Sequence, residues 1–209
     1  MIVKDSSANK CGVICSSLEI IAGMLLTEEE FLLIKTQYVE EVLVLLRRLA
    51  KIEAISLFNE HGRQTEKTLP EISVMMSKEI IRVADVINDA FDRWSPEEQQ
   101  LANDFILHFL PKSLVERVGD RLIENIPHVY RRQLVAAILS SRVAYREGCQ
   151  NIREMSEGGL ESLVRNQLHY EAQVRTMIGQ VEEAGLEDCE TIIAILEHSG
   201  ARTQRELKL

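Results

Sequence analysis

The sequence predicts an all-α protein, a bundle of several helices with at most one short strand close to the N-terminus. Only 10 of the 209 residues are glycine and 4 are proline, so few residues are available to end helices or form many turns. Apolar side chains recur at steps of three and four over long stretches, which is the period of an amphipathic helix. Capping residues and glycines stand at the ends of these stretches, where helices begin and end.

The first expected helix starts near Gly12, after a short extended piece and a polar turn at residues 2–8. Apolar residues cover most of its circumference as far as Leu25. A helix of this kind is expected to be buried on several sides. Its few clearly polar residues are Ser16, Ser17 and Glu19.

A long antiparallel hairpin of two helices is expected next. Thr27 and Glu30 form a capping-box pattern, and no helix-breaking residue follows over residues 28–61. This helix would be about 50 Å long at 1.5 Å per residue. Its apolar stripe has nearly the spacing of a coiled-coil seam. The stripe consists of Phe31, Ile34, Tyr38, Val42, Leu45, Leu49 and Ile52. Residues 70–94 form a second amphipathic stretch, and the short link between the two predicts that they fold back on each other.

Caps and glycines delimit the remaining helices. Ser95, followed by proline and glutamates, predicts a new helix start and a possible subdivision of the chain near residue 95. Gly148 is the expected end of a strong helix at residues 128–147. After a break at Gly158 and Gly159, further helices are expected over residues 160–184 and 187–198.

Composition argues against two classes of partner. Acidic residues outnumber basic ones by 33 to 24, a net charge of −9, whereas a nucleic-acid-binding protein usually has the opposite sign. The arginines between Arg131 and Arg153 are interpreted as a solvated helix face. No apolar run approaches the roughly 20 residues of a membrane span, and no secretory leader is visible. We therefore expect neither a nucleic-acid nor a membrane partner, and the four scattered cysteines suit the cytoplasm.

No catalytic residue and no metal site are predicted from the residues alone. Cys11 and Cys15 could share a helix face, but no histidine lies nearby, so they are interpreted as two small buried residues. The five histidines lie singly on different expected helices. The sequence contains no glycine-rich phosphate loop after a strand and no nucleophile elbow.

The candidate binding site is at the start of the first helix. A polar loop would bring Asn9 to the N-terminal end of this helix. Gly12 has no side chain there, and Ser16 follows one turn later on the same face. Free amides, a glycine and a hydroxyl at a helix N-terminus suit a carboxylate or a phosphate. The residues alone favour a simpler structural alternative: Asn9 caps the helix, and Ser16 bonds back to a carbonyl of its own helix.

Residues 9–19 are similar to the Asn-x-x-Gly-Val-x-x-Ser-x-x-Glu element of the glutamate, leucine, phenylalanine and valine dehydrogenases. The preceding Asp-Ser-Ser-Ala-Asn-Lys at residues 5–10 resembles the large NAD-specific glutamate dehydrogenases, whose long C-terminal helical extension would account for most of the chain. Further similar stretches lie at residues 110–111, 130–134, 140–143 and 145–148.

The resemblance implies a role in the NAD-dependent oxidative deamination of glutamate to 2-oxoglutarate. It implies that Ser16 contacts the side-chain carboxylate of glutamate, that Gly12 lies in the same turn, and that Asn9 lies near the nicotinamide ribose. Where the family has Ala-Gly-Gly, this chain has Lys-Cys-Gly at residues 10–12, which puts the approach of a ligand to Asn9 in doubt. The family's catalytic Lys and Asp and its dinucleotide-binding turn precede this helix. The chain is therefore expected to be inactive alone and to bind no NAD by itself.

We accordingly divide the chain into residues 1–26, a remnant of the dehydrogenase cofactor and substrate domain, and residues 27–209, a helical module with a structural or assembly role. The chain is expected to be a shortened or divided form of a longer enzyme. Its expected partners are the upstream dehydrogenase domains and further copies in a homo-oligomer. The alternative is a free-standing helical protein-interaction module that kept the first helix as an ordinary core helix.

Overall fold

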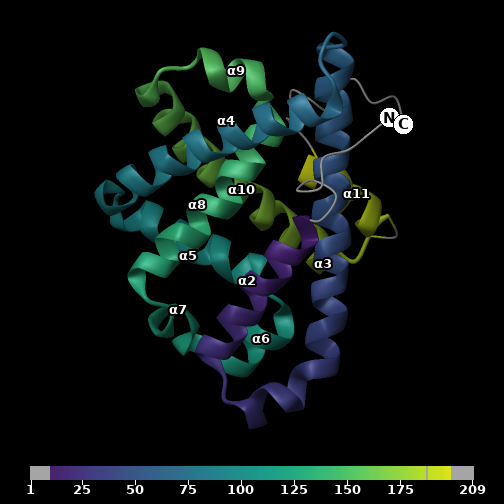
Figure 1. The fold of residues 1–209 in the computed structure, drawn as a ribbon. Helices are drawn as coiled ribbons and strands as arrows, with labels where there is room; N and C mark the ends of the chain where they lie inside the picture. The colour runs from purple at the N-terminus through teal and green to yellow at the C-terminus, as the bar shows by residue number, and fades with distance from the viewer. Residues whose placement is uncertain (1–9, 187, 199–209) are drawn as a thin grey trace.

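The computed structural model describes residues 10–186 and 188–198, and all regular structure in those ranges is helical (Figure 1). The prediction of an all-α multi-helix bundle is confirmed. The expected strand near residues 2–5 lies outside the described ranges. The helices are α2 (Lys10–Leu25), α3 (Glu28–Arg63), α4 (Leu69–Ala90), η1 (Phe91–Arg93), α5 (Pro96–Phe109), α6 (Lys112–Val118), η2 (Gly119–Arg121), α7 (Leu122–Asn125), α8 (His128–Glu147), α9 (Cys149–Glu154), α10 (Glu157–Ala184) and α11 (Cys189–His198).

The expected caps begin and end the helices as their local chemistry requires. The Glu30 amide donates to Thr27 Oγ1 at 3.3 Å, and the Thr27 amide donates to Glu30 Oε2 at 3.0 Å. The same reciprocal pair forms between Ser95 and Glu98 at the start of α5. Gly148 ends α8 with a φ of 82°, a conformation that glycine adopts without strain.

The start of α10 differs from the prediction. A break was expected at Gly158 and Gly159, but both glycines lie in the first turn of the helix, which begins at Glu157. Ser156 is the N-cap, and its hydroxyl accepts from the Gly159 amide at 3.2 Å. A capping bond can therefore hold two glycines in a first turn, where their low helix propensity has less effect than in a helix interior.

The centre of the molecule is the contact between α4 and α8, with α5 and α10 packed beside them (Figure 1). Val83 and Ile87 on α4 are fully buried, as are Val135 and Leu139 on α8. They belong to a continuous apolar core that extends to α2, α3 and the short helices α6 and α7. Burial of these side chains is the main force that stabilises the bundle.

The helices α3 and α4 meet near the short link that joins them, where Leu57 packs with Leu69 and Ile72 in a smaller apolar cluster. Beyond the link α4 crosses the body of the molecule at a wide angle to α3 (Figure 1). The long antiparallel neighbour of α3 is α2, which runs beside its first half. The departure from a simple hairpin has a physical reason: α2 and α6 cover the inner stripe of α3, and α4 buries its own stripe on α8.

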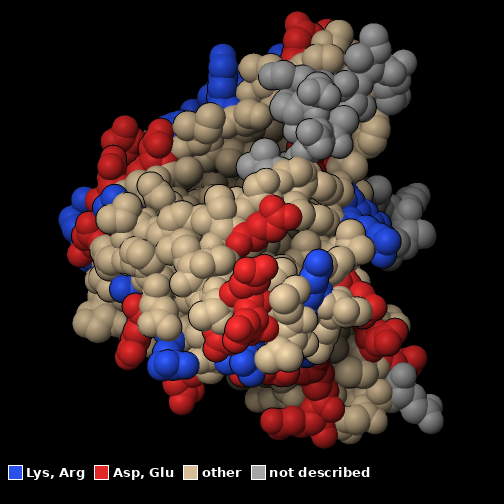
Figure 2. Space-filling view, turned by 60° about the horizontal axis from the view of Figure 1, so that its bottom comes forward, with Lys and Arg blue, Asp and Glu red and all other residues tan. Residues whose placement is uncertain are grey.

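Three of the five arginines of the basic stretch pair with carboxylates on other helices, so this stretch joins helices and differs from the solvated helix face that the sequence suggested. These pairs are Arg132 with Asp92, Arg142 with Glu171, and Arg153 with Glu79. Figure 2 shows one face of the molecule, on which basic side chains stand singly or in small groups among uncharged and acidic ones. Within the described ranges no helix combines the length and the apolar character that a membrane crossing requires.

Candidate functional site

The candidate site lies on the side of α2 that faces away from the core. Gly12, Ser16, Ile20 and Gly23 follow one another at steps of four and three, and all four are exposed. Met24 extends this open face of α2 toward the end of the helix. Gly12 and Ser16 are therefore one turn apart on the same face, as the sequence predicted.

The opposite side of α2 is fixed in the core. Leu18, Ile21 and Ala22 are almost completely buried. Tyr38 on α3 donates its hydroxyl to the carbonyl oxygen of Leu18 at 2.8 Å, and burial raises the pKa of the Tyr38 phenol. Near the start of the helix, Cys11 Sγ lies 3.8 Å from the Leu46 carbonyl oxygen, a weak hydrogen bond. α2 is thus held near its start and near its middle, about two turns apart, so that its open face has a fixed direction.

Ser16 is exposed on this fixed helix. Among the described residues it has no hydrogen-bond partner, so the bond back to a carbonyl that the structural alternative expected is not formed there. Asn9, the residue matched to the cofactor contact, lies outside the described ranges. The arrangement therefore offers one exposed hydroxyl donor, one turn after a glycine, to an acceptor that approaches from outside.

Glu19 is the one acidic side chain on the open face of α2. Its carboxylate accepts from Cys15 Sγ at 3.6 Å. Burial raises the pKa of the Cys15 thiol first, and the neighbouring Glu19 carboxylate raises it further. Cys15 is therefore a neutral thiol at pH 7 and not an activated nucleophile.

No metal centre is assembled by the residues that the structure describes. None of their His, Cys, Asp and Glu side chains gather in groups of three. Cys11 and Cys15 are half-buried free thiols, whereas the sequence analysis expected both to be buried. A hollow of about 460 Å³ lies between α4 and α10, lined by side chains of both charges such as Lys78, Asp85 and Glu161, and it includes no residue of α2.

Comparison with known proteins decides what kind of chain this is. Glutamate dehydrogenase 2 of Dictyostelium discoideum is 30% identical over 160 residues, which are 71% of this chain and 15% of the relative. The NAD-specific glutamate dehydrogenase of Saccharomyces cerevisiae is 31% identical over 179 residues, 77% of this chain and 16% of the relative. The chain is homologous to one part of the large NAD-specific glutamate dehydrogenases. The probable NAD-specific glutamate dehydrogenase of Schizosaccharomyces pombe, 27% identical over 160 residues, agrees with this.

The resemblance to large NAD-specific glutamate dehydrogenases is therefore confirmed, and the chain spans about a sixth of the length of the relatives it matches. No family model and no solved structure matches the chain.

Two features of the site were not predicted from the sequence. The bond from Tyr38 to the Leu18 carbonyl was missed, because Tyr38 appeared only as a member of an apolar stripe. The exposure of Ile20 and Met24 was also missed, since α2 was expected to be buried on several sides and in this chain one face is open. Hydropathy could not reveal this, because it measures how apolar a face is and not what covers it.

Proposed function

We propose that this chain is a segment of an NAD-dependent glutamate dehydrogenase, which converts glutamate to 2-oxoglutarate by oxidative deamination, and that α2 faces the substrate. The open face of α2 supports the proposal. It carries an exposed hydroxyl without a partner among the described residues, at Ser16, and an exposed glycine one turn earlier, at Gly12. A surface helix that evolved only to be solvated would carry charged residues in the places of Gly12, Ser16, Ile20 and Gly23.

In this role Ser16 is a substrate-binding residue. Its hydroxyl donates a hydrogen bond to the distal carboxylate of glutamate, and Gly12 leaves room for the substrate one turn earlier. The bond orients the substrate and carries no proton or hydride. NAD bound to the complete enzyme would supply the hydride acceptor.

The helical module at residues 27–209 positions α2. Tyr38 and Leu46 of α3 contribute to this, because they hold α2 at its middle and near its start. The upstream dehydrogenase domains, which would supply the catalytic Lys and Asp and the dinucleotide-binding turn, cover the open face. The chain alone is therefore inactive and takes no NAD by itself. Four free thiols at Cys11, Cys15, Cys149 and Cys189 favour the reducing cytoplasm as its compartment.

The proposal is tested by Ser16→Ala in the complete enzyme, with glutamate and with norvaline, which lacks the distal carboxylate. A hydrogen bond to a charged group contributes roughly 1.5–3 kcal/mol, so kcat/KM for glutamate should fall by about ten- to a hundredfold. The value for norvaline and the melting temperature should change little. Ser77→Ala is the matched control, because Ser77 is exposed on α4 and bonds only to the Ser73 carbonyl of its own helix at 2.9 Å.

Each other outcome has a definite meaning. An equal loss for both amino acids would show that Ser16 supports the fold or the cofactor and does not read the glutamate side chain. No loss for either one would contradict a substrate-binding role and favour the free-standing interaction module. Turnover by the purified chain alone, abolished by a substitution within it, would contradict the expectation that it is inactive.

A further inference from the structure

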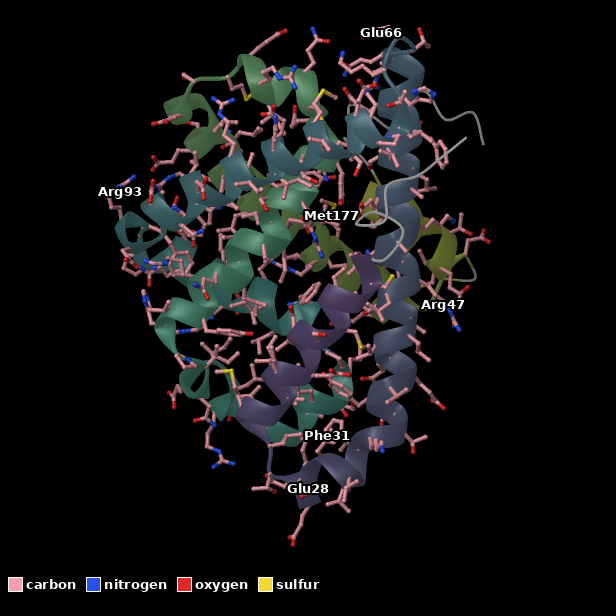
Figure 3. All side chains as sticks on the ribbon, viewed as in Figure 1. Glu28, Phe31, Arg47, Glu66, Arg93 and Met177 are labelled. Carbon is pink, nitrogen blue, oxygen red and sulfur yellow. The ribbon has the colours of Figure 1, made fainter. Side chains whose placement is uncertain are left out.

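The outer side of α3 is apolar although nothing in the described part of the chain covers it. Phe31 points inward from α3 toward the body of the molecule, whereas Arg47 points away from it (Figure 3). On the sides of α3 that the core does not cover, large apolar side chains are exposed to solvent. They are Leu32 (58% exposed), Leu33 (74%), Val39 (44%), Leu43 (44%), Val44 (64%) and Phe58 (45%). A group of this size on one helix is typical of an interaction surface.

Three of these residues have the spacing of a helix-pairing seam. Leu32, Val39 and Leu43 fall with Thr36, Leu46 and Ala50 at alternating steps of four and three, as in a coiled coil. Leu46 is already buried, so the seam borders the core at that residue and is exposed at Leu32, Val39 and Leu43. α3 has 36 residues and is about 54 Å long, which is ample length for a second helix to lie along it.

Charges along the exposed side of α3 differ between its two halves. Glu28, Glu29 and Glu40 are exposed in the first half, with Lys35 as the exception. The second half carries exposed basic side chains instead. These are Arg47, Arg48 and Lys51. Two α3 helices in antiparallel orientation place each acidic half against the basic half of the other, whereas a parallel pair places like charges together.

We propose that this outer face of α3 is the interface between two copies of the chain, packed antiparallel about a two-fold axis near Leu43 and Val44. Around that axis Glu40 of one copy lies beside Arg47 of the other. The two-fold symmetry makes the surface complementary to itself, as a dimer interface must be. This inference does not rest on the proposed dehydrogenase function, because it uses neither Ser16 nor the open face of α2.

Sedimentation of the full chain over micromolar concentrations tests the proposal. The chain should form a dimer, and Leu43→Asp should raise the dissociation constant at least about tenfold, since it sets two carboxylates close together at the axis. Glu40→Arg and Arg47→Glu should each weaken the dimer, and the double variant should recover most of the loss because the pair is restored with exchanged signs. Ile81→Asp is the matched control, since Ile81 is an apolar residue of α4 that is 59% exposed and lies outside the seam.

Disulfide trapping gives a second and independent measurement. Leu43→Cys should form a disulfide between two chains under mild oxidation, because the two copies of this residue meet near the axis. The unchanged chain, with its four natural cysteines, and Ile81→Cys are the controls and should give little cross-linked product.

A chain that stays monomeric throughout, or a dimer that Leu43→Asp leaves intact, would overturn the proposal. The first result is also the one expected if upstream dehydrogenase domains cover this face. Neither result affects the Ser16→Ala test, so failure of the interface and failure of the proposed function are distinguishable.

Discussion

The two long helices α3 and α4 distribute their apolar residues in different ways. α4 buries Ile72, Val83 and Ile87 completely and turns mainly polar residues to solvent. α3 buries fewer residues over a greater length and exposes large apolar side chains such as Leu33 and Val44 on its other side. The fold of this chain covers most of the apolar surface of α4, whereas it leaves much of the apolar surface of α3 exposed.

The bonds that attach the two helices differ as well. α4 is held mainly by apolar packing on α8 at the centre of the molecule. α3 lies at the edge, where its inner apolar stripe packs on α2 and α6 and polar contacts add to this packing. Tyr38 reaches α2, and Glu41 accepts from the Ser113 amide and hydroxyl at the start of α6, at 3.0 and 2.8 Å. Because α3 is well anchored on its inner side, its apolar outer face points to a partner and not to poor folding.

The largest expected effect is that of Ile87→Asp in α4. Ile87 is fully buried, and an unpaired carboxylate there costs several kcal/mol, comparable to the whole stability of a domain. The chain should lose its cooperative thermal transition in circular dichroism. Leu43→Asp on the outer side of α3 is the matched variant and should shift monomer stability by about 1 kcal/mol or less. Similar effects of the two changes would contradict the contrast between the helices.

A smaller effect is expected for Glu41→Gln, which weakens the attachment of α3 to α6. Burial acts to raise the pKa of Glu41, but the hydrogen bonds from Ser113 and Gln37 and the charge of Lys112 outweigh it, so this pKa is lowered. The charged carboxylate therefore stabilises the fold above the unfolded-state pKa of about 4.3, and this contribution is lost as pH falls through the lower folded-state pKa.

Glu41→Gln should consequently reduce stability at pH 7 by about 1–2 kcal/mol, a value discounted for the partial exposure of the side chain. It should cost less at pH 3, which lies below the unfolded-state pKa, because protonation of the unfolded chain then removes part of the stabilisation that the charge provides. Urea unfolding at the two pH values measures the difference. Glu124→Gln, at an exposed position of α7, is the control and should cost little at either pH. An equal loss at both pH values would mean that the charge of Glu41 is not what joins the helices.

Tyr38→Phe is expected to cost about 1 kcal/mol, the net contribution of one hydrogen bond. The change keeps the ring, which packs edge-on against Phe31 at 5.5 Å between centroids, and removes the bond to the Leu18 carbonyl. Hydrogen exchange should show faster opening of α2 amides, while those of α4 and α8 stay protected. Uniformly faster exchange in all three helices would show that α2 and α3 unfold only together with the centre.

The smallest expected effect is a gain. Gly23 lies within α2 on its open face, and a Cβ placed there would meet no atom within 4 Å. Gly23→Ala should therefore stabilise the isolated chain by roughly 0.5–1 kcal/mol, because alanine loses less conformational freedom in a helix. If upstream domains cover this face in the complete enzyme, the same methyl group should reduce activity there. A gain in stability with unchanged activity would indicate that Gly23 remains open to solvent.

Part of the site could be predicted from the sequence, and part could not. The spacing of Gly12 and Ser16 predicted a shared face, because the period of a helix fixes which residues lie together. That this face is open, and that Ser16 finds no partner among the described residues, followed only from the structure. The role of Ser16 in substrate binding stays a prediction, as does that of Asn9, which lies outside the described ranges.

The sequence by itself determined where several of the helices begin and end. Thr27, Ser95 and Gly148 act through hydrogen bonds and backbone angles within a few residues, so their effect can be read without knowledge of the fold. Only the tertiary structure decided which apolar faces are covered. Val83 and Val44 are equally apolar, yet one is buried against other helices and the other is 64% exposed. The hydrophobic effect has no direction, so a sequence can show that a face needs a partner but not which partner it has.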